Sequence, residues 1–484
     1  MSFVSTEFII FALLVIPIFF MLGQKRRWLL LLVASYCFYA FWMPSYLILI
    51  LFSTLVDYLV ALALQHTAAE RITRRRALLT CSVLANIGVL FIFKYANLFG
   101  QTAEQMAQAL GIPLQVGALN VLLPVGISFY TFQSMAYTFD VYRGRLPAER
   151  HFGVFATYVA YFPQLVAGPI ERATNMLPQF RTKLSFDYDR VVSGLRLAAW
   201  GAFKKVVIAD RVALYVNEVF DNLESYSGLS LVIAVLFFAF QIYCDFSGYS
   251  DIAIGVARVM GFRLMKNFRR PYLATSLRDF WRRWHISLST WFRDYVYISL
   301  GGNRLGFPRQ LFNLLLVFVL SGLWHGANWT FMLWGLFHGL VIIAETLFKA
   351  LFPNAALRNG PGRAFSLIYT FVLVYIGWIL FRANDLGEIS YILRHLLDFS
   401  QGVAELTRPF AAGLLPQRAE FLLSFGLIGL VLAVDIIDER QGILAVFGRL
   451  STLWRWAVYY FLAITIYVSL FYGTTVQEFY YFQF

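Results

Sequence analysis

Long uninterrupted apolar runs recur along the whole chain, and they constrain its fold more than any other feature. A helix needs about 20 apolar residues to cross a bilayer, and only helices and closed barrels satisfy their backbone polar groups in lipid. Because the runs are long and continuous, we predict an all-α polytopic membrane protein. The candidate spans are residues 3–23, 28–43, 46–64, 77–99, 119–142, 152–170, 191–209, 229–257, 311–324, 327–348, 364–381, 419–437 and 453–473.

Composition supports this fold class and excludes others. Apolar residues make up 60% of the 484 residues and charged residues only 14%, while aromatic residues reach 18%. A water-facing surface of this size would not tolerate such a balance, which excludes a soluble enzyme, a disordered chain and a collagen-like repeat. The stretch 152–170 carries Pro163, Gly168 and Pro169, so we expect a re-entrant segment there.

The net charge of +13 indicates membrane topology, and we predict no nucleic-acid partner. Lys and Arg concentrate in the cytoplasmic loops of membrane proteins. Basic loops at 24–27, 65–76 and 143–150 are mutually consistent if all three are cytoplasmic, which places the amino terminus on the periplasmic side.

One basic segment stands apart from the other loops. Between Arg258 and His285 the chain holds eight basic residues and one acid, so 28 residues carry +7 of the net charge. We expect residues 258–304 to form a cytoplasmic or interfacial segment. It is either a topology signal alone or also a docking surface for an anionic donor. The alternation of rings and guanidiniums at Trp281, Arg282 and Arg283 favours the additional docking surface and indicates an interfacial helix.

His325 is the strongest candidate for a catalytic residue. It stands between two apolar spans, where a polar side chain is costly and often marks function, although an interhelical hydrogen bond is the simpler alternative. Gly322 and Gly326 clear one helix face for a substrate or for another helix. Trp324 and Asn328 supply a ring and a polar group beside the imidazole. A general base for acyl transfer needs such surroundings, and His285 could polarise the acyl carbonyl or share the proton.

Other chemistries have weaker support. His325 and His338 are 13 residues apart and would point in different directions on one helix, no metal-binding motif is present, and we predict no metal. Neither a GxSxG motif nor a P-loop occurs. The polar island around Gly248 contains Asp245 and Asp251, which we expect to cap a broken helix and to pair with arginines rather than to catalyse.

Several motifs together resemble the membrane-bound O-acyltransferase family, in its bacterial branch that acetylates exopolysaccharides. The most specific are the tract from Phe280 to Trp291 with the following Tyr297 to Asn303, and the run from Leu323 to Asn328. The resemblance spans nearly the whole chain. It implies one membrane domain over residues 1–484, shaped as a bowl of about 11–13 tilted and re-entrant helices around a central tunnel. The family's signature histidine, which activates the acceptor hydroxyl, maps onto His325, and the second family position onto His285.

The resemblance also implies partners. It predicts an enzyme of the bacterial inner membrane, in contact with lipid, that binds no cofactor and takes acetyl from acetyl-CoA or an acyl-carrier thioester. The acetyl group would reach an exopolysaccharide of the alginate or cellulose type, directly or through periplasmic acetyltransferase partners. A polysaccharide exporter and a non-catalytic scaffold are the alternatives. The aromatic tail, residues 478–484, would serve as an interfacial anchor, insert in or beside the tunnel, or dock a partner.

Overall fold

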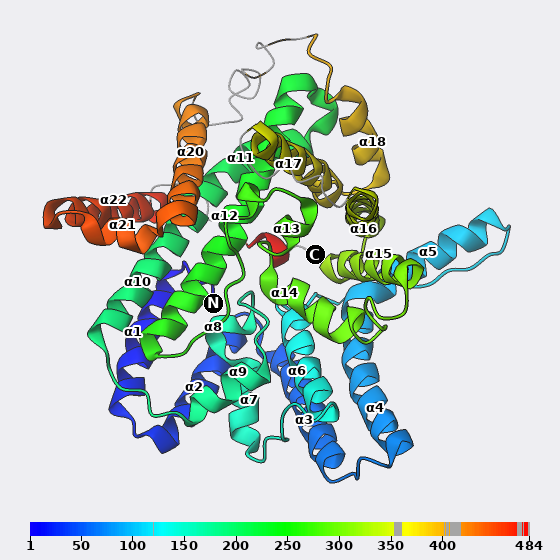
Figure 1. Cartoon of the computed structure of the whole chain (residues 1–484), viewed down its shortest axis with the longest axis vertical. Helices are drawn as coiled ribbons and strands as arrows, with labels where there is room; N and C mark the ends of the chain where they lie inside the picture. The colour runs from blue at the N-terminus through cyan, green and yellow to red at the C-terminus, as the bar shows by residue number, and fades with distance from the viewer. Residues whose placement is uncertain are drawn as a thin grey trace. The chain divides into compact units, whose positions relative to one another are not determined.

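The computed structural model describes residues 1–119, 121–352, 361–400, 402, 406, 418–471, 477 and 479–482. Over these residues the regular structure is helical, which confirms the predicted all-α class (Figure 1). The chain divides into two compact units, one formed by Met1–Ala198 with Ile252–Met265 and the other by Ala199–Asp251 with Lys266–Gln483. A single domain over residues 1–484 stays a prediction.

The first unit contains the helices of the amino-terminal part of the chain. They are α1 (Thr6–Met21), α2 (Gln24–Ala40), η1 (Pro44–Tyr46), α3 (Leu47–Gln65), α4 (Ile72–Leu90), η2 (Phe91–Tyr95), α5 (Ala96–Ala109), α6 (Ile127–Tyr142), α7 (Phe152–Ala160), α8 (Phe162–Leu165) and α9 (Ala173–Arg181). Within this unit α3 packs against α4 and α6, and α2 packs against α7.

The second unit contains most of the later helices. They are η3 (Phe203–Ala209), α11 (Asp210–Asp221), η4 (Leu223–Ser225), η5 (Pro271–Leu273), α13 (Leu277–Trp281), α14 (Ile286–Trp291), η6 (Phe292–Tyr297), α15 (Phe307–His325), α16 (Trp329–Leu351), α17 (Pro361–Arg382), α18 (Leu386–His395), α20 (Arg418–Gln441), α21 (Ile443–Arg449), α22 (Thr452–Phe471) and η7 (Tyr480–Phe482). Two further helices, α10 (Tyr188–Ala202) and α12 (Gly228–Met260), contribute residues to both units.

Eight of the described helical segments are long and apolar enough to cross a membrane. They are Pro44–Gln65, Ile72–Ala109, Gly228–Met260, Phe307–His325, Trp329–Leu351, Pro361–Arg382, Ala419–Gln441 and Thr452–Phe471. The segment 152–170 forms no such helix, because the chain breaks at Tyr161 between α7 and α8, and Pro163 stands in the first turn of α8. Proline has no backbone N–H, so it fits the first turn of a helix, where that donor would have no partner within the helix.

The predicted break at Gly248 is wrong, since α12 is one continuous helix of 33 residues. A Cβ at this position would lie 2.7 Å from the backbone oxygen of Gly201 and 3.1 Å from the backbone nitrogen of Lys205. Gly248 therefore lets another segment of the chain approach the helix closely, a role that needs no helix break.

Glycines also bring α15 and α16 together at the end of α15 that carries His325. A Cβ on Gly322 would lie 2.2 Å from the backbone oxygen of Phe331, and one on Gly335 would lie 2.3 Å from that of Phe318. The two helices pack closely against each other. The sequence left open whether a substrate or another helix approaches Gly322, and in the structure it is the helix α16.

Candidate active site

The second unit brings His285 and His325 together in its interior. The two imidazole ring centres lie 6.3 Å apart, although 40 residues separate them in sequence. His285 is 0% exposed and His325 is 2% exposed. This separation lies within the range of packed ring pairs, so the two imidazoles are neighbours in the interior.

His325 is held at the carboxyl end of α15 by a change in backbone direction. Gly326 follows it in an extended conformation, and α16 begins at Trp329, capped by the Asn328 side chain, whose oxygen accepts from the Thr330 amide at 3.0 Å. A Cβ on Gly326 would collide with the Phe331 ring at 2.1 Å. The sharp turn between α15 and α16 therefore fixes where the imidazole lies.

His285 adopts a left-handed backbone conformation with φ 41° and ψ 54°, immediately before α14. A non-glycine residue in this region is strained and needs surrounding contacts to hold it. Asn267 provides them, because its backbone oxygen accepts from the Ile286 amide at 2.9 Å and its side-chain oxygen accepts from the Ser287 hydroxyl at 2.7 Å. Sequence reasoning missed Asn267, which no motif distinguishes.

Burial decides the protonation of His285, which lies outside the eight candidate spans. Loss of hydration lowers the pKa of His285 from 6.5 to about 3. The imidazole is therefore neutral at physiological pH, and a neutral ring has one nitrogen that donates and one that accepts.

Aromatic rings line the space around both histidines. The ring centre of Trp324 lies 5.0 Å from that of His325 and 5.8 Å from that of His285. Trp334 lies 5.0 Å from His325, and Phe246 lies 4.6 Å from His285. Such walls exclude water and strengthen electrostatic interactions inside the site.

The aromatic tail supplies one further ring to this site. Phe479, Tyr480 and Tyr481 are all less than 9% exposed. The Tyr481 ring centre lies 5.7 Å from that of His325 and 6.2 Å from that of His285. Of the three alternatives for the tail, these described residues favour insertion beside the histidines. Residues 478, 483 and 484 lie outside the described part of the chain.

The predicted donor-binding residues do not share one location. Arg282 is exposed, whereas the neighbouring Arg283 donates to Asp279 at 3.0 Å and to Glu439 at 3.3 Å. Trp281 is buried, with its ring centre 5.2 Å from that of His338 and 5.5 Å from that of Trp334.

The expected interfacial helix is replaced by two short, largely buried helices, α13 and α14. The apolar rings of this stretch face the interior of the second unit, since Phe280 on α13 and Trp284 between the two helices are each 1% exposed. These rings pack in the protein core, so they do not identify a membrane anchor.

Asp245 and Asp251 pair with lysines, not with the expected arginines. Asp245 lies 2.7 Å from the Lys205 ammonium, and Asp251 lies 2.8 Å from that of Lys204. These two consecutive lysines belong to the π-helix η3, which presents both toward α12.

His338 lies on α16 rather than on the helix of His325, because the chain turns at residues 326–328. Both imidazoles contact the Trp334 ring, at centre distances of 4.8 Å for His338 and 5.0 Å for His325. The expectation that His325 and His338 point in different directions assumed one continuous helix, so it does not apply to this pair.

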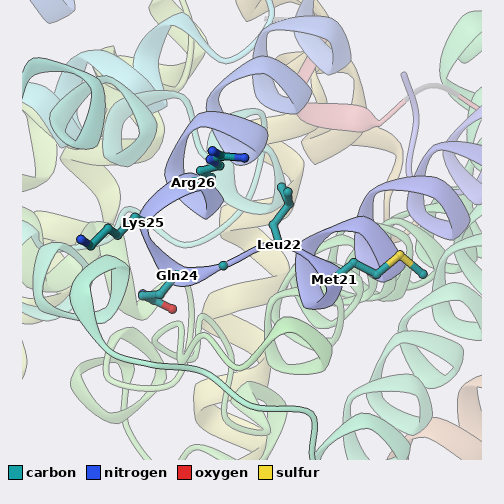
Figure 2. Close-up of a pocket in the computed structure, with 6 residues that line it drawn as sticks. Met21, Leu22, Gln24, Lys25 and Arg26 are labelled. Carbon is teal, nitrogen blue, oxygen red and sulfur yellow. The ribbon is translucent and has the colours of Figure 1, made fainter.

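A surface hollow of about 400 Å³ in the first unit lies apart from these residues in the sequence and contains none of them. Figure 2 shows its lining at the turn between α1 and α2, formed by Met21, Leu22, Gly23, Gln24, Lys25 and Arg26. None of these six residues is a histidine, a cysteine, a serine or an acid, so this hollow is not the candidate active site.

Residues 148–383 match the model of the membrane-bound O-acyltransferase family. The probable alginate O-acetylase of Pseudomonas aeruginosa is 40% identical over 410 residues, which cover 84% of this chain and 77% of the relative. This chain belongs to the membrane-bound O-acyltransferase family. It is an acyltransferase and a multi-pass membrane protein.

Two more distant relatives of this acyltransferase are named for peptidoglycan and for teichoic acid. The peptidoglycan O-acetyltransferase of Helicobacter pylori is 35% identical over 401 residues, covering 78% of this chain and 74% of the relative. The teichoic acid D-alanyltransferase of Bacillus subtilis is 25% identical over 281 residues, covering 55% of this chain and 70% of the relative. The family match includes both His285 and His325.

Proposed function

We propose that this acyltransferase is an inner-membrane O-acetyltransferase that uses His325 as its general base and His285 as its assistant. The observation that carries the proposal is the buried pairing of these two imidazoles, whose ring centres are 6.3 Å apart. The sequence relationship to alginate O-acetylases supports an acetyl group as cargo and an exopolysaccharide of the alginate type as final acceptor, with a cellulose-type polymer as the alternative.

In the proposed reaction, an unprotonated ring nitrogen of His325 removes the proton from an acceptor hydroxyl. The hydroxyl oxygen attacks the thioester carbonyl carbon, a C–O bond forms, and the C–S bond breaks. The departing thiolate takes up the proton that His325 had accepted. Neutral His285 donates a hydrogen bond to the carbonyl oxygen as negative charge develops on it.

The donor in this proposal is a cytoplasmic thioester, either acetyl-CoA or an acyl-carrier protein. Exposed basic side chains of the second unit, Lys266, Arg269 and Arg282, form the docking surface for its acidic groups. Arg283 does not contribute directly, because Asp279 and Glu439 neutralise it. Trp281, Trp324 and Asn328 contribute to binding the donor, and Gly326 shapes the turn that carries His325.

The acetyl group passes through a tunnel in the membrane, and the amino terminus is periplasmic. Transfer to the polysaccharide proceeds directly or through periplasmic acetyltransferase proteins. No bound cofactor takes part in this scheme, since the thioester supplies the activated acyl group.

The test is acetyl turnover by the purified protein with labelled acetyl-CoA. His325→Ala should lower kcat by about 10²- to 10⁴-fold, the usual contribution of a general base. The matched control is His66→Ala, which removes an exposed histidine on the carboxyl side of α3. Equal turnover by wild type and His325→Ala would disprove the proposed mechanism.

A further inference from the structure

A buried charge cluster in the second unit lies outside the histidine pair and has no part in the chemistry above. It consists of Lys205, Asp210 and Asp245, which are 2%, 6% and 2% exposed. Burying three charges costs free energy unless their geometry satisfies every charged group. This cost indicates that the cluster has a specific structural or functional task.

The Lys205 ammonium has three acceptors, one for each of its protons. Its nitrogen lies 2.8 Å from Asp210 Oδ1, 2.7 Å from Asp245 Oδ1 and 2.9 Å from the backbone oxygen of Gln477. Burial lowers the pKa of Lys205, but the two carboxylates more than offset this effect and hold the pKa above its ordinary value. Lys205 is therefore an ammonium that forms ion pairs with the two acids and donates a hydrogen bond to the Gln477 backbone oxygen.

Asp245 makes a second contact with this part of the chain. Its other carboxylate oxygen, Oδ2, accepts a hydrogen bond from the Tyr480 backbone N–H at 2.7 Å. Both contacts with the tail use backbone atoms, the oxygen of Gln477 and the nitrogen of Tyr480. They fix the register of the segment rather than recognising its side chains.

This register decides which side chain faces the histidines. Tyr481, directly after the clamped amide of Tyr480, places its ring 5.7 Å from His325 and 6.2 Å from His285. Apolar packing alone would tolerate a slip between neighbouring aromatic residues, because Phe479, Tyr480 and Tyr481 are all large rings. Directional hydrogen bonds to buried charges would not tolerate such a slip.

We propose that Lys205, Asp210 and Asp245 are positioning residues that clamp the chain at Gln477 and Tyr480, and so hold Phe479, Tyr480 and Tyr481 in register against His285 and His325. The clamped segment then forms one wall of the acyl-transfer site. This inference rests on the proposed function for its effect on catalysis, but the clamp itself can be tested without any catalytic readout.

The first experiment measures whether the tail is docked. In a full-length Cys37→Ser, Cys81→Ser background, Phe479→Cys reports docking through its rate of reaction with a maleimide, while Cys244 stays buried. Lys205→Met should raise this rate at least about tenfold, since removing one partner leaves two carboxylates buried without their counter-charge.

The neighbouring residue provides the matched control. Lys204 is also buried, belongs to the same π-helix, and pairs with Asp251 at 2.8 Å without a contact to the tail among the described hydrogen bonds. Lys204→Met should leave the cysteine at position 479 protected. Equal labelling of the two lysine variants, whether fast or slow, would overturn the clamp.

A second pair of variants tests the clamp from the side of the tail. Tyr480→Pro removes the N–H that donates to Asp245, whereas Tyr480→Ala keeps it. Only Tyr480→Pro should match Lys205→Met in labelling rate. The double variant Lys205→Met, Tyr480→Pro should raise the labelling rate less than twofold above that of either single variant. Independent, additive effects would show that Lys205 does not act through this contact.

Catalysis gives the final readout. In Lys205→Met, kcat for acetyl transfer should fall at least about tenfold with KM for the donor unchanged, because the donor surface is intact. Release of the tail with unchanged kcat would overturn its role as a wall of the site. If wild type shows no acetyl turnover, the proposed function fails, while the labelling results still decide whether the clamp exists.

Discussion

Gly322→Ala tests how the contact between α15 and α16 positions His325. The new Cβ would lie 2.2 Å from the backbone oxygen of Phe331 and 3.3 Å from the Cα of Gly335. Ordinary van der Waals contact begins at 3.4 Å, so the two backbones must separate by about 1.2 Å, the difference between 3.4 and 2.2 Å. Neither contact atom belongs to a flexible side chain, and therefore the strain cannot be relieved by a rotamer change.

This displacement reaches the candidate active site from both helices. His325 is three residues beyond Gly322 on α15, and Trp334, whose ring centre lies 5.0 Å from that of His325, is on α16. Overpacking of this kind costs about 1–3 kcal/mol of stability. A misplacement of about 1 Å in a catalytic group can cost about 10²-fold in rate. We expect Gly322→Ala to lose both stability and acetyl turnover by these amounts.

The assay compares thermal unfolding in detergent and acetyl turnover with those of Gly426→Ala. Gly426 lies inside α20, and a methyl group added there would meet no neighbouring atom within 4 Å, so the same chemical change should leave stability unchanged or slightly raised. If Gly322→Ala is as stable and as active as Gly426→Ala, the close helix contact is wrong. If it loses stability but keeps its turnover, the contact does not position His325.

Two further outcomes follow from the charges in the second unit. Burial lowers the pKa of His285 from 6.5 to about 3. Below pH 6.5 the unfolded protein therefore binds a proton on this imidazole that the folded protein does not bind. Wild type should therefore lose about 1.4 kcal/mol of stability between pH 7.5 and 5.5 that His285→Gln does not lose, and parallel pH profiles would contradict this. Arg282→Glu should raise KM for the acetyl donor about two- to tenfold, in the range of an exposed charge reversal, while Arg76→Glu, another exposed arginine, should not. An equal KM for both variants would remove Arg282 from the docking surface.

The sequence predicted the two histidines because an imidazole near apolar spans is costly and chemically distinctive. It did not predict Asn267 or Lys205. Asn267 acts through a contact with residues 286 and 287 that no local pattern records. Lys205 stands inside the candidate span 191–209, where a buried charge needs a partner, but the sequence does not say which acids pair with it. The break expected at Gly248 failed for a related reason: a glycine in a helix signals either a break or a close neighbour, and only the neighbour's position decides between them.

The sequence by itself determined that the protein lies in a membrane and which types of polar side chain it holds there. Apolar runs too long for a soluble surface require a membrane, and they make helices the way to satisfy the backbone. Tertiary structure alone decided that His285, His325 and the tail residue Tyr481 share one site, although as many as 196 positions separate them (481 − 285). Local patterns encode periodicity and propensity, whereas the meeting of distant segments depends on packing and on buried charges such as Lys205 finding all of their partners.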